Sequence, residues 1–246
     1  MKIIVCLKVC NGEINPFDES ALEYALRLSD DVTVLSMGPE STKSVLTPLT
    51  RLGAKVVLLS DSIYAGSDTL ATSYILSVAI KEMEYDLILC GKQTIDGDTA
   101  QVGPMLSSRL NLPLITNALE LTVDNNSVFA RTREGEENIS LPGIITLEKV
   151  FYLRFPSIFS KASEILIKSN QEIGCDENKC GIKGSPTRVL KTYENQSGKR
   201  KCKFISYDEL IPLVKELSEA DRGLKYSILS LARRSLILFL DELKSL

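Results

Sequence analysis

The sequence predicts an α/β protein with a doubly wound, mainly parallel sheet, an antiparallel extension and a C-terminal arm that ends in helices. Short continuous apolar runs alternate with segments of helical periodicity over residues 1–115. This alternation indicates βαβ units in a sheet that is covered on both faces. The 246 residues, 44% of them apolar and 25% charged, suit one large domain with an extension.

Four apolar runs predict the parallel strands, at residues 2–8, 32–37, 55–60 and 86–90. Helical periodicity fills the intervals at residues 19–28, 41–52, 69–83 and 99–110. Each crossover should be right-handed. Ligands of such sheets bind beyond the carboxyl ends of the strands, near the reversal of strand order.

Extended segments follow, separated by polar turns, at residues 114–122, 128–132, 139–141 and 144–147. We interpret them as antiparallel strands that extend the parallel sheet. From about residue 154 the chain becomes polar and turn-rich, as an arm on a surface does. We therefore expect an α/β domain at 1–190 and a C-terminal arm at 191–246.

The C-terminal arm carries two helical patterns, at residues 206–217 and 224–243. The second pattern has an apolar face. That face either packs on its own domain or meets a partner chain.

Composition excludes several functions. Lys and Arg number 29 and Asp and Glu 32, a net charge of −3, so the chain lacks the basic footprint of a general nucleic-acid binder. It contains no histidine, which excludes Ser-His and Cys-His couples and imidazole metal ligands.

No stretch approaches the ~18 apolar residues of a membrane span, and the first apolar run is too short for a signal peptide. We expect a cytoplasmic protein with reduced thiols.

Cysteines occur in two settings. Cys6 and Cys90 lie in apolar runs and should be buried thiols. Cys175 and Cys180 form a CxxxxC pair in a polar loop, where a disulfide or a metal is one alternative. Because a zinc site normally needs two closer-spaced pairs, we expect no metal.

The most informative loop is KQTIDGD, which follows the strand at 86–90 and precedes a helix expected from about Thr99. Backbone N–H groups at a helix start favour a phosphate. Gly91 and Gly97 would let the backbone approach a ligand or adopt a positive φ. Asp96 and Asp98 should bond ribose hydroxyls or backbone N–H groups. Asp98 and Thr99 are also the candidate N-caps of the helix that follows. The alternative is an ordinary capped turn between strand and helix.

Two further loops lie on the same edge of the expected sheet. Asn15 and Pro16 follow the first strand and suit a helix start, with Asn15 as its cap. The segment 36–40 follows the second strand. The three loops predict one crevice, although the first can equally be a plain helix cap.

Several segments together resemble the beta subunit of electron transfer flavoproteins over about residues 1–190. They are VCLK at 5–8, NPFDESALEYALRL at 15–28, LSMGP at 35–39, GAKVVLLSD at 53–61, GKQTIDGDTAQVGP at 91–104, RFPSI at 154–158 and GIKGSPTRV at 181–189. The resemblance implies a Rossmann-like, adenine-nucleotide-binding fold. It also implies a heterodimer with an alpha subunit that holds a redox-active flavin. The C-terminal arm at 191–246 would contact that subunit.

Nucleotide contacts carried over by the resemblance come from three loops and the first strand. They are Cys6, Asn15, Pro16, Phe17, Asp18, Met37, Gly91, Lys92, Gln93, Thr94, Ile95, Asp96, Gly97, Asp98, Thr99, Ala100, Gln101 and Val102. The sequence DGDTAQVGP is similar to the electron-bifurcating branch, which implies FAD rather than AMP. NADH would then be the electron donor and ferredoxin or flavodoxin an acceptor. No residue of this chain is expected to act as a catalytic acid or base.

RFPSI resembles the loop with which this subunit docks an acyl-CoA dehydrogenase, within about residues 150–163. Phe155 would be its apolar anchor and Ile158 its support; the alternative is a loop packed on its own domain. Two departures stand out: the segment 8–15 is shorter than a hairpin usual there, and FSKASEI follows Ile158.

Two other classes of protein compete with this interpretation. One is a stand-alone nucleotide-binding module without a redox role. The other is a nucleotide hydrolase or transferase, which lacks support because no catalytic base or P-loop lysine arrangement is present.

Overall fold

The computed structural model describes residues 1–124, 126–189 and 212. The chain divides into two units, Met1–Leu190 and Lys191–Leu246, and every element below belongs to the first. The helices and partner contacts expected within 191–246 lie, apart from residue 212, outside the described residues. In the described part of the chain, no helix has both the length and the apolar character that crossing a membrane requires.

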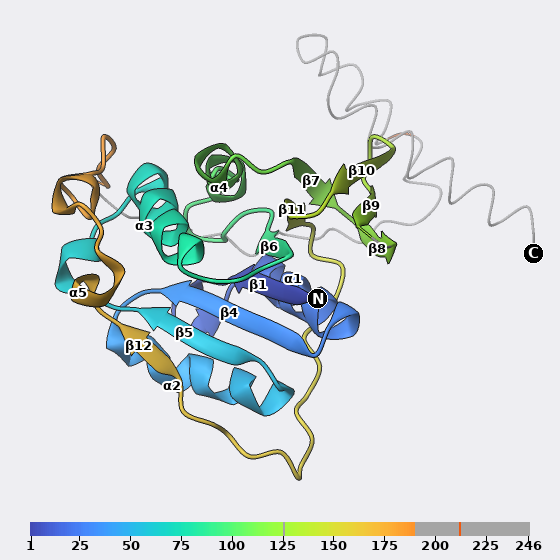
Figure 1. Ribbon diagram of the computed structural model, residues 1–246, viewed down its shortest axis with the longest axis horizontal. Coiled ribbons are helices and arrows are strands. Elements are labelled where there is room, and N and C mark those ends of the chain that lie inside the picture. Colours follow the sequence, from blue (N-terminus) through green and yellow to red (C-terminus); the bar gives the residue numbers. More distant parts are fainter. Residues whose placement is uncertain (125, 190–211, 213–246) are drawn as a thin grey trace, which may run out of the picture. The chain divides into compact units, whose positions relative to one another are not determined.

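A seven-stranded parallel sheet forms the centre of the first unit (Figure 1). Its order is β12-β5-β4-β1-β6-β11-β7, and every neighbouring pair runs in the same direction. The strands are β1 Lys2–Cys6, β4 Asp31–Met37, β5 Lys55–Leu59, β6 Leu87–Gly91, β7 Leu114–Ala118, β11 Gly143–Leu147 and β12 Leu166–Lys168. In the register of the central strands, Cys6 of β1 lies beside Leu35 of β4 and Cys90 of β6.

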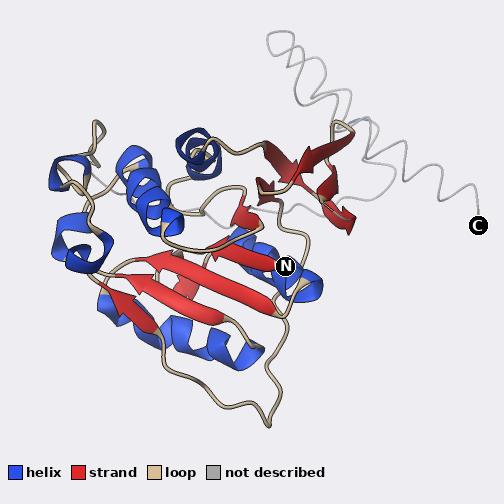
Figure 2. Cartoon of the chain, in the orientation of Figure 1, coloured by secondary structure: helices blue, strands red, loops and turns tan. Residues whose placement is uncertain are grey.

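Helices cover both faces of this sheet, which confirms the doubly wound fold (Figure 2). Helix α1 Pro16–Leu28 and the segment α2 Lys43–Leu46 pack on the face that carries Val5. Helices α3 Thr69–Lys81 and α4 Val102–Leu110 pack on the face that carries Cys6. Shorter helical turns are η1 Glu40–Thr42, η2 Thr47–Leu52, η3 Ser62–Tyr64, α5 Asn170–Ile173 and η4 Glu177–Lys179.

The helix expected at 41–52 is three short pieces, η1, α2 and η2. Pro48 explains the interruption, since it has no N–H to donate and its ring restricts the preceding turn. The apolar side chains still reach the core, because Leu46 and Leu49 are both buried.

The antiparallel part of the fold is a separate three-stranded sheet, β10-β9-β8, rather than a continuation of the parallel sheet. Its strands are β8 Glu120–Asp124, β9 Ser127–Arg131 and β10 Glu136–Ser140. The expectation of antiparallel strands at 114–122 and 144–147 was wrong for residues 114–118 and 144–147, which join the parallel sheet within β7 and β11. All five residues of β11 are buried, as in a strand covered on both faces, whereas β9 buries alternate residues.

A minimal hairpin occupies the shortened segment after β1. Strands β2 Val9–Cys10 and β3 Glu13–Ile14 pair through Asn11 and Gly12, whose φ angles are 53° and 81°. Two positive φ angles in succession are the requirement of a tight two-residue hairpin, and Asn-Gly meets it at low cost.

Candidate functional site

The strand order reverses between β1 and β6, and this reversal defines the candidate site. From β1 the chain passes through α1 to β4 on one side, whereas β6 lies on the other side and leads into α4. The two helices cover opposite faces of the sheet. The loops that follow β1 and β6 therefore lead to opposite faces of the sheet, and a ligand crevice is expected between them at the carboxyl edge.

Asp18 in the first turn of α1 connects the ends of both strands. Its carboxylate accepts hydrogen bonds from the backbone N–H of Lys8 at 2.8 Å and of Gly91 at 3.0 Å. The side chain is buried, and burial raises the pKa of its carboxyl to about 7 despite these two hydrogen bonds. Asp18 is thus a structural link beneath the crevice.

Gly91 has a different role from the one expected of it. Its φ is not positive, and a Cβ at this position would lie 2.7 Å from the Cβ of Phe17 and would overlap the Asp18 carboxylate. The missing side chain accommodates helix α1, whereas contact of the Gly91 backbone with a ligand stays a prediction.

Asn15 joins the first loop to the loop after β6. It is fully buried, its Nδ2 donates to the Gln93 carbonyl at 2.8 Å, and its Oδ1 accepts from the Ile95 N–H at 3.3 Å. Asn15 does occupy the N-cap position of α1, but its side chain makes no capping hydrogen bond. The expected side-chain cap was therefore wrong, because the amide is engaged across the crevice.

Asp96 is held by Lys8, which also lies across the crevice. Lys8 Nζ lies 2.6 Å from Asp96 Oδ2, and Asp96 Oδ1 accepts from the Gly97 N–H at 2.7 Å. Partial burial favours the neutral carboxyl and is the largest single influence, but the hydrogen bonds from Lys8, Thr94 and the Gly97 N–H, together with the charge of Lys8, outweigh it and lower the pKa of Asp96 to about 2. As expected, this carboxylate bonds a backbone N–H.

The loop between β6 and α4 is longer than expected, since α4 begins at Val102 rather than Thr99. Asp98 and Ala100 have φ angles of 50° and 54°, so neither can continue into the helix. The proposed caps Asp98 and Thr99 were wrong: Gln101 occupies the N-cap position, and it makes no side-chain cap. Residues 95–101 are exposed, so their backbone is accessible from solvent.

The remaining predicted residues lie along the same edge. Cys6 and Cys90 are adjacent, buried free thiols at the ends of β1 and β6. Met37 ends β4 and packs against the cluster that contains Cys6. The structure thus brings the residues of all three loops to the carboxyl ends of β4, β1 and β6.

Glu148 belongs to this edge but was missed by the sequence analysis. It directly follows β11 and is buried, and its Oε1 lies 3.0 Å from Lys92 Nζ and 3.5 Å from Arg133 Nη2. The signal was available, since a Lys and a Glu each directly follow a largely apolar strand. Neighbouring carboxyl ends place such residues together.

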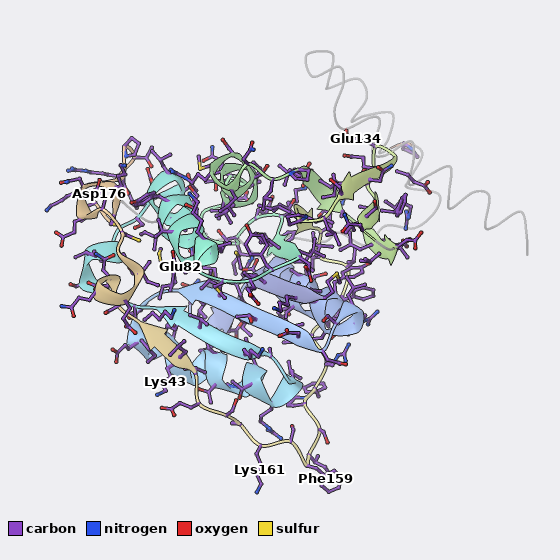
Figure 3. All side chains as sticks on the ribbon, viewed as in Figure 1. Lys43, Glu82, Glu134, Phe159, Lys161 and Asp176 are labelled. Atoms are coloured by element: carbon purple, nitrogen blue, oxygen red, sulfur yellow. The ribbon has the colours of Figure 1, made fainter. Side chains whose placement is uncertain are left out.

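The arm formed by residues 148–165 connects β11 to β12 and contains the expected docking residues. Phe155 is 96% exposed and Ile158 85%, so neither packs on its own domain. Figure 3 shows Phe159, which is 86% exposed, at the outer tip of this arm beside Lys161.

Two other features lie away from the crevice. A hollow of about 450 Å³ is lined by residues that include Val57, Met83 and Leu166, and by none of the predicted site residues. Cys175 and Cys180 are buried free thiols, and the described residues contain no cluster of three or more candidate metal ligands.

The fold and these loops define a Rossmann-like α/β protein with polar loops at its reversal of strand order. The family model of the electron transfer flavoprotein domain matches residues 3–148. The electron transfer flavoprotein subunit beta of Megasphaera elsdenii is 41% identical over 73% of this chain and 74% of its own length. The chain therefore belongs to the electron transfer flavoprotein beta-subunit family, a family of electron transfer, and the resemblance noted above is confirmed.

Two relatives with other names agree with this assignment. Protein FixA of Azorhizobium caulinodans is 36% identical over 89% of this chain and 88% of its own length. Subunit CarD of the caffeyl-CoA reductase-Etf complex of Acetobacterium woodii is 34% identical, with 73% and 75% covered.

Proposed function

We propose that this chain binds an adenine nucleotide, FAD rather than AMP, in the crevice at the carboxyl ends of β1, β4 and β6. In this proposal it functions as one half of a heterodimer with an alpha subunit. The observation that carries the proposal is the loop 92–101, which is exposed over residues 95–101, stands at the strand-order reversal and is tied to the first loop by buried Asn15.

The donor set suits an adenine nucleotide. The start of α4 has no side-chain cap, so its first backbone N–H groups are available to phosphate oxygens. The Thr99 hydroxyl adds a donor in the same loop, whereas the Thr94 hydroxyl is hydrogen-bonded to Asp96. Asp96 pairs with the Lys8 ammonium, whereas Asp98 accepts a hydrogen bond from the neutral Gln93 amide, so Asp98 is the carboxylate better suited to ribose hydroxyls.

A bound FAD would supply the redox chemistry, and the residues described above would bind and orient it. The chain has no histidine, consistent with a subunit that positions a cofactor rather than transferring protons itself. FAD is favoured over AMP by the small side chains of Ala100 and Val102 in DGDTAQVGP, which change what the loop can hydrogen-bond.

Electron bifurcation is the activity that a second FAD would support. NADH would donate two electrons, of which ferredoxin or flavodoxin receives one and the alpha-subunit flavin the other. The name of CarD, a subunit of a caffeyl-CoA reductase-Etf complex, supports a CoA-ester-linked partner, and we propose an acyl-CoA dehydrogenase at Phe155 and Ile158.

The deciding experiment is nucleotide counting. The chain is coexpressed with its alpha subunit, the complex is purified and denatured, and released FAD and AMP are quantified per heterodimer. Two FAD per heterodimer supports the proposal. One FAD with one AMP would replace bifurcation by simple electron transfer, and a chain that forms no complex and retains no flavin would indicate a stand-alone module.

A further inference from the structure

The arm at 148–165 exposes apolar side chains although its backbone is fixed. The tip, residues 155–159, carries Phe155, Ile158 and Phe159, all at least 85% exposed. The arm contains no helix or strand. Side chains of α1 and η2 hold it on both sides of the tip.

The first anchor is Glu23, a buried residue of α1. Its Oε2 accepts from the backbone N–H of Arg154 at 3.1 Å and from Arg154 Nε at 3.0 Å, and its Oε1 accepts from Arg154 Nη2 at 3.0 Å. Burial disfavours the charged carboxylate, yet the hydrogen bonds from Arg154 and Arg27 hold the pKa of Glu23 below its ordinary value. A buried carboxylate is costly unless it is paired, and here its principal partner is the arm.

Neighbouring side chains extend this anchor. Ser20 Oγ accepts from the backbone N–H groups of Val150 and Phe151, each at 3.1 Å. The Phe151 ring lies 4.9 Å from the Tyr24 ring and 3.9 Å from the Arg27 guanidinium carbon. The arm is therefore attached to α1 over the residues that precede the tip.

The second anchor is Arg51 of η2. Its Nη2 donates to the Ser157 carbonyl at 3.0 Å and its Nε donates to the Ser160 carbonyl at 3.1 Å. Beyond the tip, Thr50 Oγ1 accepts from the Ser163 N–H at 2.9 Å. The backbone of the tip is thus fixed from both sides while its apolar side chains stay in solvent.

We propose that Glu23 and Arg51 are positioning residues that pre-organise the tip for insertion into an apolar pocket of the partner dehydrogenase. This inference rests on the proposed docking function. A loop already fixed in its bound conformation loses less conformational entropy on binding, so the anchors raise affinity without touching the partner. Loosening either anchor should raise the partner's Kd and KM but leave electron transfer within the assembled complex unchanged.

The test uses the complete heterodimer and measures partner Kd by surface plasmon resonance, KM and kcat for electron transfer, and amide hydrogen exchange of the arm. Glu23→Gln and Arg51→Ala should each raise Kd and KM about fivefold or more, with kcat within about twofold. Exchange of the arm should accelerate in both variants. Arg51→Lys, which keeps one donor, should give a smaller effect. Arg131→Ala, which removes an exposed pair with Glu120 on the separate sheet, is the matched control.

Two outcomes distinguish failure of the positioning role from failure of the docking proposal. If Phe155→Ala weakens binding while Arg51→Ala and Glu23→Gln bind normally, docking stands and the positioning role is overturned. If Phe155→Ala also binds normally, the docking proposal itself fails. Should Glu23→Gln fold poorly, Arg51→Ala decides alone, because Arg51 is only partly buried and makes its contacts with backbone carbonyls.

Discussion

The carboxylate of Asp18 accepts the backbone N–H of Gly91 at 3.0 Å, which connects the first turn of α1 to the end of β6. The same carboxylate accepts the Lys8 N–H at 2.8 Å, just beyond β1. One buried side chain therefore links the ends of two paired strands, at the point where their loops begin.

The first prediction concerns pH. Burial raises the pKa of Asp18 to about 7, whereas an unfolded Asp has an ordinary value near 3.8. Between these two values the folded state holds a proton that the unfolded state has lost. The contribution of Asp18 to stability is therefore full below about pH 4 and is lost as the pH rises to 7, with a slope of about 1.4 kcal/mol per pH unit.

Chemical unfolding from pH 4 to 8 checks this prediction. Asp18→Asn removes the titrating group, so the stability difference between wild type and variant should change with pH in that window. A difference that stays constant from pH 4 to 8 would contradict the raised pKa.

The second prediction concerns Gly91. Gly91→Ala places a methyl group against Phe17 and Asp18, so it should lower the free energy of unfolding by about 1–3 kcal/mol. Gly97→Ala is the matched control, because the nearest atom to its added Cβ is Thr94 Oγ1 at 3.4 Å. It should change stability by less than about 0.5 kcal/mol in urea titrations. Equal effects of the two substitutions would refute the close approach of α1 to β6.

The third prediction concerns Asn15. Asn15→Ala removes both hydrogen bonds to the loop after β6 and leaves the Gln93 carbonyl and Ile95 N–H without these partners. We expect a loss of about 1–3 kcal/mol and a heterodimer that retains less nucleotide in this subunit. Asn138→Ala, at an exposed position of β10, controls for the substitution itself. Wild-type nucleotide content in Asn15→Ala would argue against this crevice as the binding site.

The fourth prediction concerns the tip of the arm. Phe155→Ala should weaken the partner dehydrogenase complex about tenfold or more, as truncation of a central apolar anchor does. Phe129→Ala, which removes an exposed ring from β9, should leave affinity unchanged. Calorimetric titration of the dehydrogenase into each heterodimer measures both, and similar affinities would exclude Phe155 as the anchor.

The four parallel strands β1, β4, β5 and β6 were predictable because they are mainly apolar runs with no competing pattern. The prediction of helices failed where a single residue interrupts a helical pattern, as Pro48 does in the segment 41–52. The parallel strands β7 and β11 were misjudged as antiparallel where spacing alone was available: the full burial of β11, which distinguishes it from β9, depends on helices from elsewhere in the chain.

For the candidate site, the sequence indicated which loops meet but not how they are joined. Asn15 was predicted at a helix start, and its amide instead reaches the loop after β6. Lys8 pairs with Asp96 although 88 positions separate them. Such pairings depend on the order of strands in the sheet, and periodicity in one segment carries no information about that order.

The position of β12 has a consequence for the length of the arm. Four strands separate β11 from β12, so the chain between them must cross about 24 Å of sheet and also return along it by about 17 Å. Residues 148–165 could span about 60 Å if fully extended. The arm is therefore longer than the shortest path from β11 to β12 requires, and its extra length projects outward from the sheet. Deleting a few residues from the arm should shorten this projection while β12 stays paired with β5.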